Sequence, residues 1–272
     1  MLEPHKIRQF YLQGFEFYGD ISKKQIKIRT NDKRFISLNK IRSRLNSRSL
    51  TRYLIHFAPI NVYASILDWS MPERVGEKSK ANRAYPIRGD YVVDIDVPQL
   101  WRPWNGYSTN NLYSVGLQLA CDKTTTFLDK IRENYSDIRI VFSGKRGFHI
   151  HVRDFEIRDW THYDVSNPIK SHEVARYIYT LHLQRAVGGY SRYHFILSTD
   201  PLRIMTVPNT LNGKTGLVCF EVGNPADFEA LTLEKVVQKS DAKRFFYDSV
   251  FKYATDLVHS HPEPTVFEVG DE

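Results

Sequence analysis

The alternation of apolar and polar residues along the chain predicts a succession of strands and helices. Strands are expected over 26–29, 35–38, 62–67, 91–97, 138–142, 148–152, 195–197 and 216–222, where apolar residues alternate or form short runs. Helices are expected over 4–18, 38–57, 109–134, 171–186 and 233–258, where apolar residues recur at helical spacing. Residues 70–89 are polar and contain glycine and proline, so a loop is expected there. This mixture predicts an α+β fold in which one central sheet carries the chemistry.

The strand expected at 91–97 carries two carboxylates. Asp94 and Asp96 stand two residues apart in an apolar run, and side chains at that spacing emerge on one face of a strand. Two acids on one face repel each other and lose hydration, so they need a compensating cation. Such a pair can hold two divalent ions about 3.5–4 Å apart, and Mg²⁺ suits it because Mg²⁺ binds carboxylates together with substrate phosphates. A purely structural pair, with one aspartate capping a turn and the other facing an arginine, stays open.

A second pattern suits phosphate. Residues 142–152 read FSGKRGFHIHV, which predicts a strand, a basic turn and a return strand. Two glycines let the backbone approach a ligand closely, and Lys145 and Arg146 project from the turn. His149 begins the return strand opposite Ser143, so both side chains are expected to reach one phosphate. Metal-binding acids next to a phosphate-binding hairpin indicate nucleotidyl chemistry, although a solvent-exposed hairpin would have the same turn.

A zinc site is an alternative use of this hairpin. His149 and His151 share a strand face, and a catalytic zinc needs three protein ligands and a water. A metallohydrolase would leave the basic turn without a role, and a structural role is expected for His151. Only Cys121 and Cys219 are present, which excludes a four-cysteine zinc site and a disulfide framework.

A third pattern joins an aspartate to a basic loop. Asp200 follows an apolar strand, where it could supply a third metal carboxylate. Residues 213–215 read GKT, as in a P-loop, but Pro208 stands where that motif needs a glycine. A strand rather than a helix is expected after this run, so a P-loop NTPase is excluded. Lys214 is instead expected to contact a triphosphate, with Arg203 neutralising nearby charge.

Positive charge is concentrated in one segment. The chain has a formal charge of +7, yet residues 21–53 hold eleven Lys or Arg against one acid, so this segment is +10 and the remainder is −3. A local basic stretch fits a groove that follows a polyanion, whereas a solvated helix face is the plain alternative. The residues expected to contact a single-stranded template are Lys33, Arg34, Arg42 and Arg44.

The composition is that of a globular protein. Hydrophobic residues make up 42% of the 272 positions, and no apolar run approaches twenty residues, so no membrane partner is expected. The N-terminus has no apolar stretch of the secretory kind, and a cytoplasmic location is therefore expected.

Taken in order, the three patterns resemble the signature motifs of the catalytic small subunit of archaeal and eukaryotic DNA primases, within the archaeo-eukaryotic primase superfamily. The resemblance covers roughly residues 5–225 and rests on DID at 94–96, on the hairpin at 142–152 and on TDPLRIMTVPNTLNGKTG at 199–216. It implies an RRM-like palm sheet packed on a second α/β layer in a single catalytic domain. The expected parts are an N-terminal α/β part at 1–90, the palm motifs at 91–225 and a C-terminal helix and tail at 226–272.

The resemblance also implies an activity and a site. The activity is template-directed transfer of a nucleoside monophosphate from NTP or dNTP onto a 3′-hydroxyl, or onto another nucleotide at the start of a primer, with two Mg²⁺ or Mn²⁺ ions. The implied metal ligands are Asp94, Asp96 and Asp200. The implied nucleotide-binding residues are Ser143, Lys145, Arg146, His149, Arg203, Asn212 and Lys214.

This chain departs from the family pattern at some positions. Asn212 stands where a histidine is common and Thr206 where a basic residue is usual, and asparagine can donate a hydrogen bond but carries no charge. The cysteine cluster of cellular small subunits is missing, so no zinc is expected. These features fit a reduced catalytic core from an archaeal genome or a mobile element, and leave a primase large subunit open as a partner.

Two other functions stay open. A gap-filling or end-joining polymerase of the same superfamily would extend existing 3′ ends without starting strands. A catalytically silent nucleic-acid-binding module would explain Asn212 and Thr206 as signs of decay, but the presence of all three aspartates argues against it.

Overall fold

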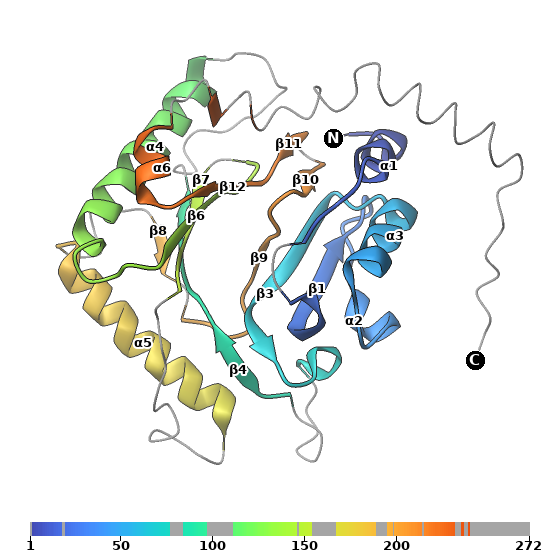
Figure 1. Ribbon diagram of the computed structural model, residues 1–272, viewed down its shortest axis with the longest axis horizontal. Helices are drawn as coiled ribbons and strands as arrows, with labels where there is room; N and C mark the ends of the chain where they lie inside the picture. The colour runs from blue at the N-terminus through green and yellow to red at the C-terminus, as the bar shows by residue number, and fades with distance from the viewer. Residues whose placement is uncertain are drawn as a thin grey trace, which may run out of the picture.

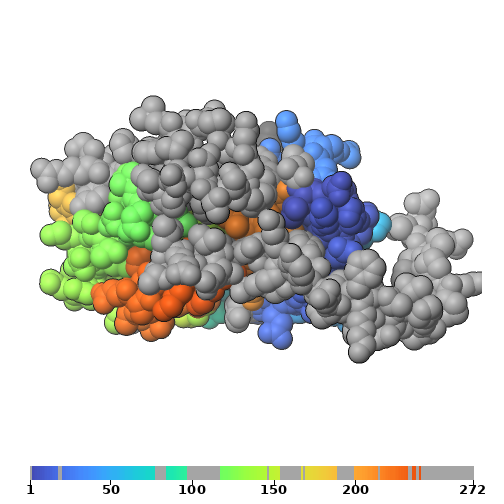
Figure 2. Space-filling model, turned by 90° about the horizontal axis from the view of Figure 1, so that it is seen from above, coloured from blue at the N-terminus to red at the C-terminus, as the bar shows by residue number. Residues whose placement is uncertain are grey.

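Two β-sheets lie in the middle of the molecule, with helices on their outer sides (Figure 1). This computed structural model describes residues 2–17, 20–76, 84–96, 111–145, 147–153, 167–188, 195–197, 199–213, 215–231, 235–236 and 239. Seen from above, the N-terminal residues in dark blue and the residues in green from the middle of the chain lie in different halves of the molecule (Figure 2). In the described part, no helix is both long and apolar enough to cross a bilayer.

The N-terminal sheet has the strand order β2-β1-β3-β4, and β9 also pairs with β3. Its strands are β1 (Lys24–Arg29), β2 (Phe35–Ser37), β3 (Asn61–Trp69), β4 (Pro86–Gly89) and β9 (Ile204–Thr206), all paired antiparallel. The helical segments around it are α1 (Pro4–Leu12), η1 (Ile21–Lys23), α2 (Leu38–Ile41), α3 (Ser47–Phe57) and η2 (Pro72–Arg74). Ile26 and Ile28 point from β1 into an apolar core shared with Leu54 of α3. By alternation, Lys27 and Arg29 therefore lie on the opposite face of the sheet.

The single helix expected over 38–57 is in fact two helices. Ser49 N–H donates to the side chain of Asn46, and the Ser49 hydroxyl accepts from Asn46 N–H. This capping box starts α3, so the helical spacing on both sides of residues 42–46 belongs to separate elements. The expected loop at 70–89 likewise contains η2 and the edge strand β4.

The second sheet is the predicted palm. Its elements follow as β5 (Tyr91–Asp96), α4 (Asn111–Ile131), β6 (Ile138–Phe142), β7 (Gly147–Val152), α5 (Pro168–Ala186) and β8 (Phe195–Leu197). The strand order is β12-β6-β7-β5-β8, with β12 (Phe220–Gly223) added at one edge, and every pair is antiparallel. A β-α-β-β-α-β chain with this order is the split βαβ arrangement of RRM domains. The α+β class with an RRM-like palm beside a second α/β layer is therefore confirmed.

The two sheets are joined by chain and by packing. β4 runs into β5 through the single residue Asp90, and β9 returns from the palm to the N-terminal sheet. Val92 of β5 packs with Leu67 of β3 and Met205 of β9 in a small apolar cluster. The remaining elements are β10 (Leu211–Asn212), β11 (Leu217–Val218) and α6 (Pro225–Glu229). The helix expected over 233–258 lies outside the described residues except at 235, 236 and 239.

Candidate active site

A cavity of about 150 Å³ lies where the two sheets meet, and it gathers residues from all three sequence patterns. The palm sheet and the turn between β6 and β7 contribute Asp94, Asp96, Ser143, Lys145 and His149, and β10 (Leu211–Asn212) contributes Asn212. The N-terminal sheet contributes Arg29, Asn61, Tyr63 and Thr206. The expected acids and the expected phosphate-binding hairpin thus face one cavity.

The alternation of β5 aims the two acids at this cavity. Val93 and Ile95 are fully buried in the core that α4 covers. Asp94 and Asp96 consequently emerge on the opposite face of the strand and line the cavity. The predicted common face of the two carboxylates is confirmed.

Arg203 supplies part of the positive charge that the acid pair needs. Its Nη2 donates to Oδ2 of Asp94 at 3.2 Å. A turn holds the arginine in place, because Arg203 N–H donates to the carbonyl of Asp200 and Leu202 N–H donates to the Asp200 carboxylate at 2.8 Å. Arg203 therefore contacts an acid of the site, as expected of a residue that neutralises nearby charge, and the nucleotide binding that the resemblance implies stays a prediction.

Asp200 itself is exposed and does not line the cavity. Leu197 of β8 lies opposite Val93, and the two strands are antiparallel. The chain therefore leaves β8 toward the start of β5, away from Asp94 and Asp96. Among the described residues, no three acidic, histidine or cysteine side chains are grouped to hold a metal ion. The expected meeting of three aspartates is thus not found there.

The hairpin needs its glycines for packing. A Cβ on Gly147 would lie 1.9 Å from the carbonyl oxygen of Ile95, so only glycine lets β7 approach β5 at this point. Gly144 has φ of +72°, and a Cβ there would lie 2.9 Å from the backbone nitrogen of Cys219. Both glycines bring protein segments together, and the approach of the backbone to a ligand at this turn stays a prediction.

Ser143 and His149 offer polar atoms that the protein leaves unsatisfied. The strand register sets His149 opposite Val141, so Ser143 lies two residues further along the same face rather than directly opposite. The two side chains are only 7% and 5% exposed, and Ser143 Oγ and His149 Nδ1 have no hydrogen-bond partner among the described residues. Buried polar atoms without a partner are rare, so these two point to a bound ligand.

His149 is uncharged at neutral pH. Burial above all, together with the charges of His151 and Arg203 and against the opposing charge of Asp96, lowers the pKa of its imidazole to about 3. Its Nε2 lies 3.8 Å from Oδ1 of Asp94, which is too long for a hydrogen bond. His149 can therefore offer a neutral hydrogen bond to a ligand, and Lys145 is the cation among the cavity residues of the palm.

Asn212 links the third pattern to the hairpin. Its side chain is only 4% exposed, and its Oδ1 accepts from Thr215 N–H at 3.4 Å. The Thr215 hydroxyl in turn donates to the carbonyl of Gly144 at 2.7 Å. The loop after β10 and the hairpin turn are thus held together at the edge of the cavity.

Some predicted residues are not tested by this geometry. Arg146 and Lys214 lie outside the described residues, and their roles stay predictions. The four predicted template residues, Lys33, Arg34, Arg42 and Arg44, are all exposed.

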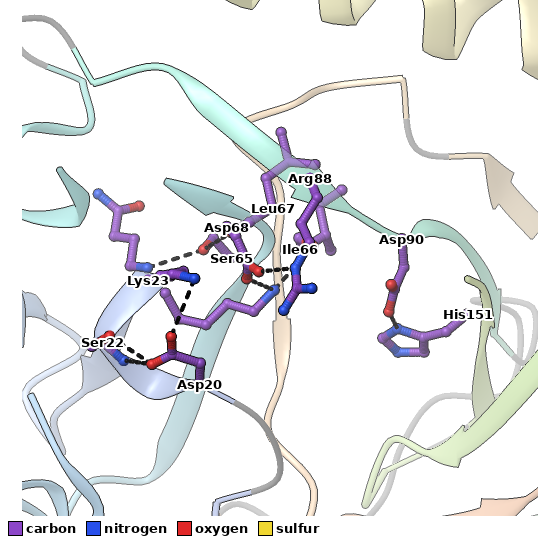
Figure 3. A network of polar contacts seen from close by, with 12 residues as sticks. Asp20, Ser22, Lys23, Ser65, Ile66, Leu67, Asp68, Arg88, Asp90 and His151 are labelled. Atoms are coloured by element: carbon purple, nitrogen blue, oxygen red, sulfur yellow. Dashed lines mark hydrogen bonds and ion pairs between the residues drawn. The ribbon is translucent and has the colours of Figure 1, made fainter. Parts of the chain in front are cut away.

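His151 has the structural surroundings that the sequence predicted. Its Nδ1 lies 3.0 Å from Oδ2 of Asp90 (Figure 3). Burial alone would raise the pKa of Asp90, but the hydrogen bond and charge of His151, with Lys24 and Arg153, hold that pKa below its ordinary value. The polar edge of His151 is therefore satisfied away from the cavity.

Three cavity residues, Arg29, Asn61 and Tyr63, were missed by the sequence prediction of the site, whereas Thr206 was named as a departure from the family pattern. Arg29 lies opposite Asn61, and Tyr63 lies opposite both Lys27 and Thr206, so these side chains share one face of the N-terminal sheet. The isoleucines at alternate positions of β1, Ile26 and Ile28, were a sequence signal that Arg29 lies on the opposite face of the strand. The meeting of that face with the palm depends on how the two sheets pack, which no local pattern records.

The family model described as DNA primase small subunit matches residues 93–223 of this chain. The DNA primase small subunit of Pyrobaculum calidifontis is 28% identical over 202 residues, which cover 64% of this chain and 63% of that protein. The DNA primase small subunit of Thermoplasma acidophilum is 25% identical over 248 residues, which cover 74% of this chain and 73% of that protein. The chain thus spans less than two thirds of the first of these relatives.

A solved structure shares the fold. It is the polymerase domain of Mycobacterium tuberculosis ligase D in complex with DNA, with a TM-score of 0.53, 12% sequence identity, and coverage of 87% of this chain and 88% of that one. The region matched by the family model contains all three motifs. Over that region, the chain is similar to DNA primase small subunits.

Proposed function

We propose that this chain is the catalytic subunit of a DNA primase, which makes short primers on single-stranded DNA from NTP or dNTP with release of pyrophosphate. The observation that supports this proposal most is the cavity between the two sheets, which Asp94 and Asp96 line together with Ser143, Lys145 and His149. Carboxylates opposite a set of phosphate-binding groups are what nucleotidyl transfer requires.

The residues of the cavity fit divalent ions held jointly by protein and substrate. Asp94 and Asp96 offer oxygen ligands, which both Mg²⁺ and Mn²⁺ accept, and substrate phosphates complete the coordination. When bound, such ions lower the pKa of the attacking hydroxyl and neutralise the leaving pyrophosphate. Asp200 is proposed as a further ligand on the strength of the family resemblance, since its turn contacts the site through Arg203.

The chain's own residues bind and orient the triphosphate. Lys145 attracts its charge, and Ser143 and His149 complete their missing hydrogen bonds on its oxygens. Asn212 adds an amide in place of the family's common histidine, and Arg146 and Lys214 add positive charge. Each such donor typically contributes a few kcal/mol of transition-state stabilisation.

The N-terminal part is proposed to carry the template. Residues 21–53 would bind single-stranded DNA mainly through phosphate contacts, which weaken as salt rises. This part and the palm would work as one catalytic domain, and a primase large subunit stays open as a partner.

The test is synthesis without a primer. The protein is incubated with single-stranded DNA, labelled nucleotides and Mn²⁺ or Mg²⁺, with no oligonucleotide supplied, and Asp94→Ala serves as control. We expect product from the wild-type protein and none from the variant. Extension of a supplied primer alone would indicate the gap-filling or end-joining polymerase, and DNA binding without any synthesis would indicate the silent module.

A further inference from the structure

An aromatic and cationic cluster runs from the cavity to the open surface of the N-terminal sheet. Phe35 of β2 lies opposite Arg29 of β1, and Arg29 lies opposite Asn61 of β3, so the three form one row across the sheet. Arg29 and Asn61 line the cavity, together with the next residue of that face, Tyr63. The row therefore begins beside the catalytic acids and ends at Phe35.

The contacts within the cluster hold the Phe35 ring in place. The guanidinium carbon of Arg29 lies 5.5 Å from the ring centroid, within the range of a cation–π contact. The ring of Tyr63 lies 5.9 Å from the same ring, at an interplanar angle of 42°. Even so, 55% of Phe35 remains exposed, so the ring keeps a large apolar surface open to a ligand.

Arg29 gives a second sign of a ligand. Its side chain is hydrogen-bonded to Tyr63, but its Nε is buried and has no hydrogen-bond partner among the described residues. A donor of a charged group left in this state is costly unless something else accepts from it. The same side chain supports the Phe35 ring and lines the cavity, so the unmet donor lies in the same cluster as the exposed ring.

We propose that Phe35, supported by Arg29 and Tyr63, is a stacking platform for a base of the single-stranded template. This inference rests on the proposed function and deepens it, because it names the surface that holds the template. Every nucleobase has a face that stacks on an aromatic ring, and strand-binding proteins combine such rings with basic residues that follow the phosphates.

The surroundings of Phe35 favour a strand over a single nucleotide. Lys33 and Arg34 are exposed at the turn directly before it, and the same segment goes on to the exposed Arg42 and Arg44. A nucleotide held at the acids presents one base and one phosphate group. A strand presents bases to Phe35 and successive phosphates to the basic residues on either side.

The test distinguishes stacking on bases from contacts with phosphates. We would measure, by fluorescence anisotropy, the binding of a labelled oligothymidylate and of an abasic strand of the same length, with wild type and Phe35→Ala. The abasic strand keeps the phosphates but offers nothing to stack. We expect Phe35→Ala to lose roughly 5- to 100-fold in affinity for the oligothymidylate, the range for loss of one stacked base, and to bind the abasic strand as the wild type does.

Three further variants serve as controls. Phe35→Trp should keep the affinity for oligothymidylate, because the larger ring still stacks. Tyr177→Ala removes an aromatic residue of similar exposure, 56%, from α5 in the palm and should change neither affinity. Arg42→Ala should weaken binding to both strands by the same factor, because it removes a phosphate contact.

Three results would overturn the inference. Phe35→Ala could bind both strands as the wild type does, or lose the same factor in affinity for both strands. It could also weaken binding of free nucleotide but not of DNA, which would assign Phe35 to the incoming base. Because the assay contains no catalytic step, a protein that binds through Phe35 but makes no primer would contradict the proposed function alone.

Discussion

Two acidic networks in this molecule differ in their surroundings. In the first, Asp68 of β3 is buried between Lys24 of β1, at 2.9 Å, and Arg88 of β4, at 2.7 Å (Figure 3). One acid there has two cations, and the network joins three strands of the N-terminal sheet. No further ligand is needed, and the role of the network is structural.

The second network places two acids and several cations around one cavity. Asp94 and Asp96 line it together with Arg29 and Lys145, and Arg203 donates to one oxygen of Asp94. Close by, buried atoms of Ser143 and His149 have no hydrogen-bond partner among the described residues. Two carboxylates beside cations and unsatisfied polar atoms fit a cation and an anion bound at once, as a metal–nucleotide complex would be. The comparison shows that a cavity with unsatisfied polar atoms beside an acid, rather than the burial of the acid, separates a reactive site from a structural one.

The largest contrast is expected from removing one charge in each network. Asp94→Asn should lower nucleotide incorporation at least about a hundredfold, because it removes a ligand without changing shape. Asp68→Asn should keep incorporation but lower the free energy of unfolding by about 1–3 kcal/mol, because two cations lose their shared acceptor. Incorporation assays and thermal unfolding of both variants measure this, and equal loss of incorporation in the two would abolish the distinction.

The next contrast compares a lysine of the cavity, Lys145, with a lysine of the Asp68 network, Lys24. Lys145→Ala should raise the KM for nucleotide by roughly 10- to 100-fold with a smaller effect on kcat, because a charge-assisted phosphate contact is lost. Lys24→Ala, in the network around Asp68, should leave the KM for nucleotide unchanged. Steady-state kinetics at varied nucleotide concentration provide the measurement. The sequence predicts the same rise for Arg146→Ala, and an unchanged KM would remove that residue from the phosphate site.

A smaller effect, on Mn²⁺ affinity, is expected from removing the arginine beside each acid, Arg203 or Arg88. Arg203→Gln should tighten Mn²⁺ binding without nucleotide by about fivefold, because the ion no longer competes with a guanidinium for Asp94, a contact of about 1 kcal/mol. Arg88→Gln removes the equivalent partner of Asp68 and should leave Mn²⁺ affinity as it was. Calorimetric titration with Mn²⁺ distinguishes them, and weaker binding by Arg203→Gln would mean that Arg203 supports the ion instead of competing with it.

The smallest effect is expected at the pair of Asp90 and His151. Because the pKa of Asp90 is held below its ordinary value of 3.8 in the folded protein, its charge stabilises the fold above that pH and loses this effect as pH falls below it. Asp90→Asn should therefore lower the free energy of unfolding by about 1 kcal/mol or less near neutral pH. Denaturant unfolding as a function of pH should show the difference vanish in acid. A difference that grows as pH falls would contradict the assigned direction.

The sequence predicted the palm well because its signals are local. The alternation in β5 was enough to set Asp94 and Asp96 on one face, and the hairpin of β6 and β7 is defined by its own turn. A regular alternation of apolar and polar residues within one element can be recognised without knowing the rest of the fold.

The rest depended on packing between distant segments. The strands β4 and β9 are short and have few alternating residues, so they were read as loop or missed. Arg29 and Tyr63 belong to the cavity only because the N-terminal sheet meets the palm. Asp200 was expected beside the other aspartates, yet it does not line their cavity and its turn reaches Asp94 only through Arg203. None of these features has a pattern within its own segment.

The central claim is that Asp94 and Asp96 form the binding site of a metal–nucleotide complex. Its most direct test is calorimetric titration of Mn²⁺, with nucleotide present, into the wild type, the double variant Asp94→Asn/Asp96→Asn and Asp68→Asn. We expect the wild type and Asp68→Asn to bind alike and the double variant to lose the site. Equal binding by all three proteins would contradict the account.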